Sequence, residues 1–96
     1  MIGDTIRTLR EQAGYSQAEL SRKLSVTRSS VNAWESGLSA PTAAYIIELA
    51  RLFHVSSDFI LGLDTSQQIN LAGLTEQEIH ILYSLLDYFD KVKSED

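Results

Sequence analysis

The stretch Ser16–Glu35, SQAELSRKLSVTRSSVNAWE, decides the fold of this chain. Ser16 with Glu19 three residues later forms a capping box that starts one short helix, and Thr27 can cap a second helix after a four-residue joint. Apolar residues recur at helical spacing in both segments and give each helix a single inward face. Those residues are Leu20, Leu24, Val31 and Trp34. Two short helices of this kind, joined by a tight turn, form a helix-turn-helix.

The outward face of the second helix carries Arg28, Ser29, Asn32 and Ala33. Short polar side chains on a helix suit contact with base edges in the DNA major groove. Arg28 can bind a guanine through two hydrogen bonds, which discriminates against other bases by about 1–3 kcal/mol, and Asn32 can read an adenine. Ser29 is a further candidate for reading bases, and Ala33 offers methyl contact to thymine. The alternative is an exposed helix face that reads nothing.

The same region resembles the Cro/CI-type (XRE-like) helix-turn-helix family, and the similarity runs from about Ile2 to Leu63. It is carried by Gln17, Leu20, Leu24, Val26, Val31, Trp34, Glu35 and Gly37. The resemblance implies an all-α, five-helix, lambda-repressor-like domain that binds double-stranded DNA. Two positions depart from the family pattern, because Ser21 stands where Ala or Gly is usual and Ser25 stands in the joint where Gly is frequent. Ser25 is the less favourable of the two, since a joint that needs a positive φ favours glycine.

Phosphate contacts position such a domain on DNA, whereas base contacts specify the sequence. By resemblance, Gln17 contacts the DNA backbone, and the positive N-terminal end of its helix assists it. The other candidates for phosphate contact are Thr27, Ser30, Arg22, Lys23 and Arg7. Thr27 is equally explained as an N-cap alone, and the basic side chains as solvated charges. The segment 36–40 is expected to add backbone N–H donors.

Arg10 resembles the family position that pairs with the glutamate ending the recognition helix, here Glu35. We expect this ion pair to fix the angle between helices and not to touch DNA. Removing one partner of a partly buried pair is costly, although the pair itself adds little stability. The alternative is a solvated Arg10.

The remaining segments of residues 1–63 complete a five-helix domain. Helical spacing predicts a first helix over about 2–13, followed by Gly14, and a core helix over about 42–53 that follows Pro41. A short fifth helix is expected to stop at Gly62. His54, at the end of the core helix, is better placed as a favourable C-terminal charge than as a metal ligand.

Composition narrows the possible functions. The 96 residues suffice for one small core with an appendage, and the absence of cysteine excludes disulfides and thiolate metal sites. No catalytic, metal-binding or cofactor-binding constellation is present, so we expect no enzyme. We also expect no membrane segment and no targeting signal, which fits a cytoplasmic protein.

The net charge of −5 lies in the C-terminal third. Residues 1–63 carry six basic and six acidic side chains, whereas residues 64–96 carry two basic and seven acidic ones. A neutral DNA-binding domain should make few phosphate contacts and show a shallow salt dependence. The acidic tail either keeps a small protein soluble or takes part in the choice of partner.

Residues 64–73 read as a linker, and residues 74–96 as a long amphipathic helix. Its apolar stripe is too wide to leave in water, so it must pack on something. We favour pairing of two copies, because a linker is not needed for back-packing and a symmetric operator requires a dimer. Folding back onto its own domain is the alternative. The residues assigned to dimerisation are Ile79, Leu82, Tyr83, Leu85, Leu86 and Phe89.

Two functions follow from these patterns. The first is a sequence-specific transcriptional regulator, a homodimeric repressor that reads the major groove with helix 27–36. The second is an antitoxin-like or adaptor protein whose acidic C-terminal helix binds a partner protein.

Overall fold

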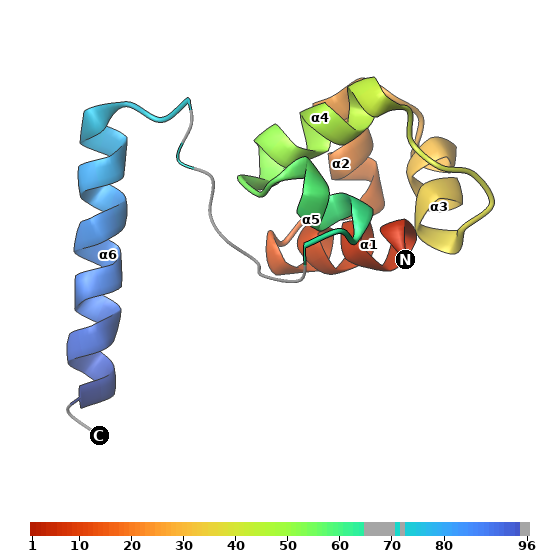
Figure 1. The fold of residues 1–96 in the computed structure, drawn as a ribbon. Helices are drawn as coiled ribbons and strands as arrows, with labels where there is room; N and C mark the ends of the chain where they lie inside the picture. The colour runs from red at the N-terminus through yellow and green to blue at the C-terminus, as the bar shows by residue number, and fades with distance from the viewer. Residues whose placement is uncertain (65–70, 72, 95–96) are drawn as a thin grey trace.

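The computed structural model describes residues 1–64, 71 and 73–94 (Figure 1). These residues form six α-helices and no strand, which confirms the all-helical expectation. The helices are α1 (Ile2–Gln12), α2 (Gln17–Leu24), α3 (Arg28–Ser36), α4 (Ala43–Phe53), α5 (Ser57–Leu61) and α6 (Glu76–Ser94). The predicted linker 64–73 lies largely outside the described residues.

Side-chain caps set where the helices begin. The Ser16 hydroxyl accepts the Glu19 N–H at 3.0 Å, and the Glu19 carboxylate accepts the Ser16 N–H at 3.2 Å, which completes the predicted capping box of α2. Thr27 caps α3 by accepting the Ser30 N–H at 3.1 Å. Each cap satisfies a backbone donor that has no partner inside the helix, and each is typically worth about 1 kcal/mol.

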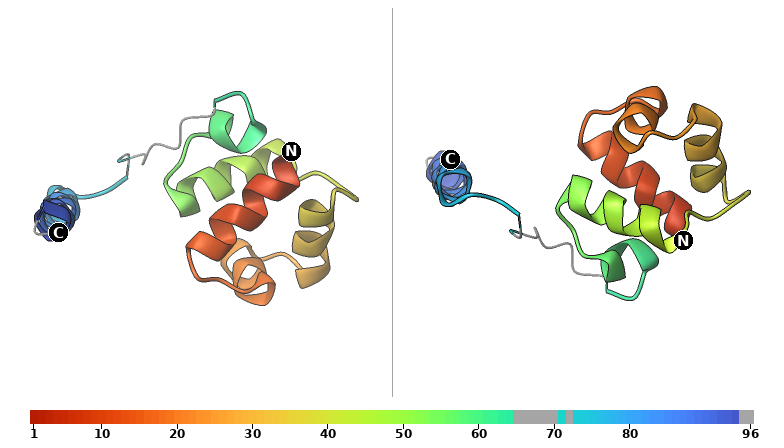
Figure 2. Two further views of the ribbon diagram at one scale, coloured as in Figure 1. Left: turned by 90° about the horizontal axis from the view of Figure 1, so that it is seen from below. Right: turned by 90° about the horizontal axis from the view of Figure 1, so that it is seen from above.

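Helices α1 to α5 enclose one hydrophobic core (Figure 2). In this bundle α1 packs on α3 and α5, α2 packs on α3 and α4, and α4 packs on α5. Full burial of a valine, leucine or isoleucine side chain contributes about 1.5–3 kcal/mol to the stability of the fold. The side chains with essentially no exposed surface are Ile6, Leu20, Val31, Leu49 and Ile60.

A glycine on α1 lets the first helix approach the helix predicted to read DNA. Gly3 is buried, and a Cβ at this position would collide with the backbone carbonyl oxygens of Trp34 and Glu35 in α3. Backbone atoms cannot move aside as the end of a flexible side chain can. Gly3 therefore sets the distance between α1 and α3.

Two helices end on a non-glycine residue in the left-handed region. Ser25 after α2 has φ 56° and ψ 41°, so the joint of the helix-turn-helix does require the positive φ that the sequence suggested. His54 after α4 has φ 55°, and no sequence signal marked this position. The left-handed conformation costs a residue with a Cβ roughly 1–2 kcal/mol.

Helix α6 stands apart from the five-helix bundle in the views of Figures 1 and 2. It has no buried residue. Its start is fixed by Thr75, which accepts the Glu78 N–H at 3.1 Å while Glu78 accepts the Thr75 N–H at 2.9 Å. Across the described part of the chain, no helix combines the length and apolar character needed to cross a membrane.

Candidate nucleic-acid interface

The outward face of α3 opens onto a shallow hollow of about 470 Å³. The residues that line it are Gln17, Arg28, Ser29, Asn32, Ala33 and Leu38. The structure thus gathers the four side chains predicted to read bases, together with Gln17 from α2. Arg28, Ser29 and Asn32 are exposed and Ala33 is half-buried, so all four present atoms to an incoming molecule.

Gln17 connects the two helices of the motif. Its side-chain amide Nε2 lies 3.3 Å from Asn32 Oδ1 and 3.2 Å from Glu35 Oε1. The bond to Asn32 restrains a side chain that is predicted to read a base. The sequence suggested a phosphate contact for Gln17, and the structure adds this positioning contact, which no spacing pattern revealed.

Glu35 is buried at the end of α3 and accepts side-chain hydrogen bonds from both α1 and α2. Its carboxylate is only 1% exposed, and it receives two hydrogen bonds from Arg10, from Nε at 2.7 Å and from Nη2 at 3.0 Å. The remaining Arg10 nitrogen, Nη1, donates to the carbonyl oxygen of Tyr15 at 2.8 Å. One arginine therefore ties α1 both to α3 and to the loop before α2.

Arg7 also reaches this carboxylate, with Nε 3.5 Å from Glu35 Oε1, although half of its side chain stays exposed. From the sequence, Arg7 was expected only as a phosphate contact. Its position three residues before Arg10 could have indicated the shared face, because residues three apart on a helix are neighbours.

The protonation of Glu35 reflects two opposed influences. Burial raises the pKa of its carboxyl, but the hydrogen bonds from Arg10, Gln17 and Arg7, with the charge of Arg10, bring the pKa below its ordinary value. In return, the hydrogen bond to Glu35 raises the pKa of Arg10. Both groups are therefore charged at neutral pH, and the pair holds the angle between α1 and α3.

The other predicted phosphate contacts take different positions. Thr27 and Ser30 share the start of α3, with their hydroxyl oxygens 2.9 Å apart. The Lys23 ammonium lies 4.9 Å from the centre of the Tyr15 ring, a cation–π contact that the sequence did not indicate. Arg22 is exposed on α2. None of these four lines the hollow.

Comparison with known proteins shows which family has a similar sequence. A helix-turn-helix family model matches residues 6–60. The chain is 28% identical over 79 residues to the HTH-type transcriptional regulator ImmR of Bacillus subtilis (strain 168), covering 82% of this chain and 62% of ImmR. It is 33% identical over 67 residues to the HTH-type transcriptional regulator DicA of Escherichia coli (strain K12), covering 70% of this chain and 50% of DicA. The chain thus spans between half and two thirds of the length of these two relatives.

Two further comparisons extend the similarity. The chain is 34% identical over 78 residues to YobD, an uncharacterised HTH-type transcriptional regulator of Bacillus subtilis (strain 168), covering 79% of this chain and 70% of YobD. The fold is similar to a chain in the solved structure of a SinR protein/SinI protein complex, with a TM-score of 0.61 at 24% identity, over 98% of this chain and 99% of that chain. The chain therefore belongs to the XRE-type helix-turn-helix family of transcriptional regulators.

Proposed function

We propose that this protein is a homodimeric repressor that recognises a two-fold symmetric operator by placing α3 in the major groove. The observation that carries the proposal is the hollow over α3, where Arg28, Ser29, Asn32 and Ala33 come together on one accessible face. An α-helix fits the width of the major groove, and these side chains supply donors, acceptors and a methyl group for base edges.

Three contacts behind this face hold α3 against α1 and α2. The Arg10–Glu35 pair, the Gln17 bond to Asn32 and the close approach at Gly3 all limit movement of α3 relative to α1 and α2. A reading helix held in one orientation loses less entropy on binding than a mobile one. We therefore assign base recognition to α3 and its positioning to the residues beneath it.

The dimer would form through α6. Its large apolar side chains remain in water in the isolated chain, with Leu86 42%, Leu85 49%, Phe89 50% and Tyr83 60% exposed. An exposed apolar face that runs along a helix in this way marks an interaction site. Two copies joined there would present two α3 helices to half-sites about one helical turn apart, or about 34–36 Å.

The DNA-binding part of the proposal is tested by selecting bound sequences from random duplexes and then measuring the affinity of Arg28→Ala for every single-base variant of the selected site. If Arg28 reads a guanine, the variant loses about 5- to 150-fold affinity for the selected site and no longer discriminates at that position. Arg51→Ala removes the same charge from exposed α4 surface and should keep the preference. An Arg28→Ala protein with unchanged base preference would contradict this assignment.

A second candidate function is a protein-interaction module. The exposed apolar face of α6 favours it, and the solved structure with the similar fold comes from a complex of two proteins. In that case a protein partner would cover α6, and DNA binding would be secondary. If the selection at low salt yields no enriched sequence, this second function is supported.

A further inference from the structure

The apolar residues of α6 follow a coiled-coil pattern. This inference rests on the proposed dimer and concerns how the two α6 helices are oriented. Ile79, Leu82, Leu86 and Phe89 recur at alternating spacings of three and four, which form the central a and d positions of a seven-residue repeat. Tyr83 and Leu85 flank this strip at e and g positions. Ile81 and Tyr88 lie at c positions, outside the strip.

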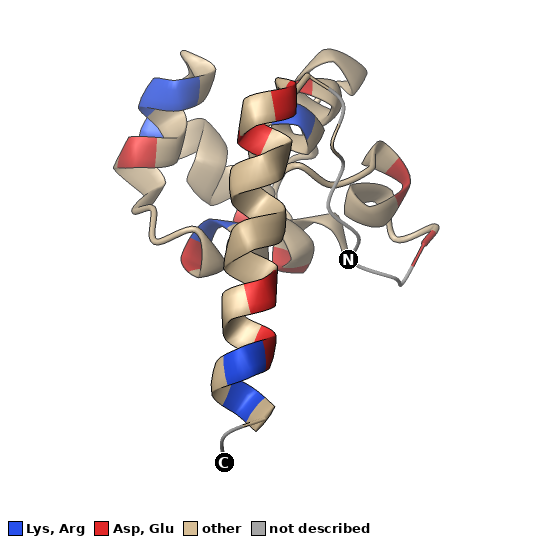
Figure 3. Ribbon diagram, turned by 90° about the vertical axis from the view of Figure 1, so that its left-hand side faces the viewer, with Lys and Arg blue, Asp and Glu red and all other residues tan. Residues whose placement is uncertain are grey.

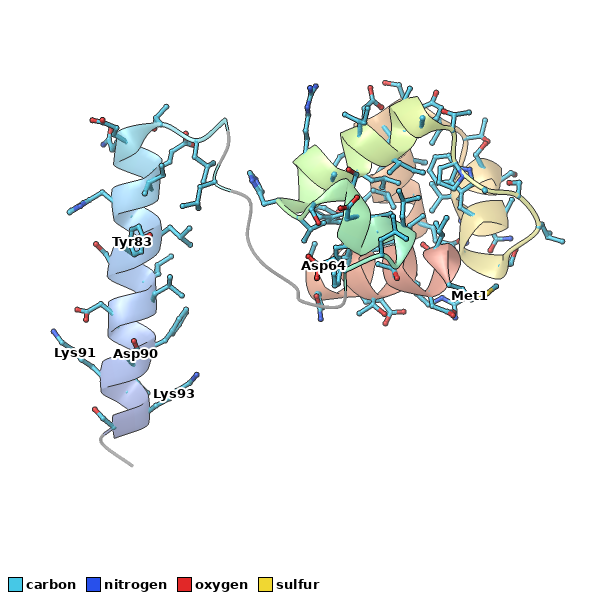
Figure 4. All side chains as sticks on the ribbon, in the orientation of Figure 1. Met1, Asp64, Tyr83, Asp90, Lys91 and Lys93 are labelled. Carbon is cyan, nitrogen blue, oxygen red and sulfur yellow. The ribbon has the colours of Figure 1, made fainter. Side chains whose placement is uncertain are left out.

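The first turn of α6 is acidic, whereas its last turns carry both signs, with Asp87 and Asp90 before the two lysines (Figure 3). The first turn carries Glu76 and Glu78, whereas the last turn carries Lys91 and Lys93 (Figure 3). Lys91 and Lys93 point to opposite sides of the helix (Figure 4). Lys91 is paired with Asp87 on the polar side, with Nζ 3.6 Å from Oδ2. Lys93 falls at the a position of the repeat, in line with Leu86 and Ile79.

In a parallel pair, the acidic first turn of α6 would meet the same turn of the second copy, and Lys93 would meet Lys93. The four carboxylates of Glu76 and Glu78 from the two copies would gather at one end with no lysine, and Lys93 would face Lys93 within the strip. A lysine at a central position of a coiled coil acts against arrangements that bring it against its own copy. The dipoles of the two helices would also point the same way.

In an antiparallel pair, each end combines both signs. Lys93 of one copy lies beside Glu76 in the first turn of the other, with Asp90 as a like-charge neighbour of Glu76, whereas Lys91 stays on the outer side of the pair. The central strip is apolar in this arrangement as it is in the parallel one, and here Leu82 meets Leu86 and Ile79 meets Phe89 of the second copy. Both pairings are symmetric about Ser84.

We propose that α6 is an antiparallel dimerisation helix, with Lys93 seated beside the acidic first turn of a second copy of the same chain. In this arrangement the two Glu76 residues lie about 24 Å apart along the helix axis, from 1.5 Å of rise per residue. The DNA-binding domains are therefore attached at opposite ends of the pair. That separation approaches the distance between half-sites in adjacent major grooves.

The orientation can be measured with spin labels, because the chain contains no cysteine. Gln77→Cys, Ser84→Cys and Lys91→Cys place labels seven residues apart on one exposed side of α6. The measurement is the inter-label distance in each purified full-length dimer by pulsed dipolar spectroscopy. Dilution with unlabelled protein gives the control for intermolecular background, and the molar mass and operator binding of every labelled variant are recorded.

An antiparallel pair predicts the shortest distance at Ser84→Cys. Labels at positions 77 and 91 are each displaced by about 21 Å along the axis, so their distances should be equal and about 10 Å longer. A parallel pair would give the same distance at all three positions and would overturn the proposal. A monomeric mass with no dipolar signal would overturn it as well. Operator binding measured on the same samples shows whether the DNA-reading function survives either result.

Discussion

Replacing Arg10 by methionine should destabilise the whole domain, because it leaves the buried Glu35 carboxylate without its main partner. The side chains of Glu35 and Arg10 are 1% and 13% exposed, so water can replace little of the lost interaction. Removing one partner of a buried pair costs about 3–5 kcal/mol, and the remaining bonds from Gln17 and Arg7 place the expected loss near 3 kcal/mol. For a domain of this size, that loss lowers the melting temperature by about 12–24 °C.

The assay is urea unfolding followed by the fluorescence of Trp34, which is the single tryptophan and lies in the core beside Tyr45. The control is Arg51→Met, which removes an exposed arginine from α4 and should change the free energy of unfolding by less than about 0.5 kcal/mol. A loss of less than about 1 kcal/mol in the free energy of unfolding of Arg10→Met would show that Arg10 is not the main partner of Glu35.

The dependence of stability on pH gives a second test of the Arg10–Glu35 pair. Because the folded protein holds the pKa of Glu35 below its ordinary value, the unfolded chain binds the proton more readily. This stabilisation is present above the unfolded pKa of about 4.3 and is lost as the pH falls through the folded pKa. Glu35→Gln should therefore show a smaller loss of stability between neutral pH and about pH 3 than the natural protein. If Glu35→Gln and the natural protein lost the same stability over this pH range, Glu35 would not contribute to the loss of stability in acid.

Three further substitutions test the remaining structural claims. Gly3→Ala should lower the free energy of unfolding by about 2 kcal/mol, because its Cβ would meet the α3 backbone; a neutral result in urea unfolding would mean that α1 and α3 lie farther apart. Ser25→Gly should raise the free energy of unfolding by about 0.5 kcal/mol, since it relieves a left-handed residue with a Cβ, and a loss of stability would argue against that backbone geometry. Leu86→Gln should convert the dimer to a monomer in light scattering, whereas Tyr88→Gln, outside the central strip, should remain dimeric; dissociation of the Tyr88 variant alone would place the contact on another face of α6.

Most of the five-helix bundle could be predicted from the sequence, because the caps and apolar spacings that define each helix are local features. Caps at Ser16 and Thr27 and helical spacing of leucines fix where a helix begins and which face it buries, and both were confirmed. The left-handed Ser25 could be suspected, since the joint stands where the family often has glycine. His54 could not, because an ordinary residue ends α4 in the same conformation.

The contacts that position the site were harder to predict. The Gln17 bond to Asn32 and the Arg7 contact to Glu35 join residues far apart in the chain, and their existence depends on helix packing angles that composition does not encode. Gly3 looks like an ordinary helix glycine until α3 is placed against it. The orientation and partner of α6 depend on a second molecule, so they remain predictions.

The central claim is that α3 reads DNA bases from a two-fold symmetric protein, and selection of bound duplexes from a random library tests it most directly. Two inverted copies of one short motif, with centres about 10 base pairs apart, are the predicted result for the natural protein. Arg28→Ala should recover the same spacing with relaxed preference at one guanine in each copy. A library that shows no enrichment at low salt, or a single motif without its inverted partner, would contradict the claim.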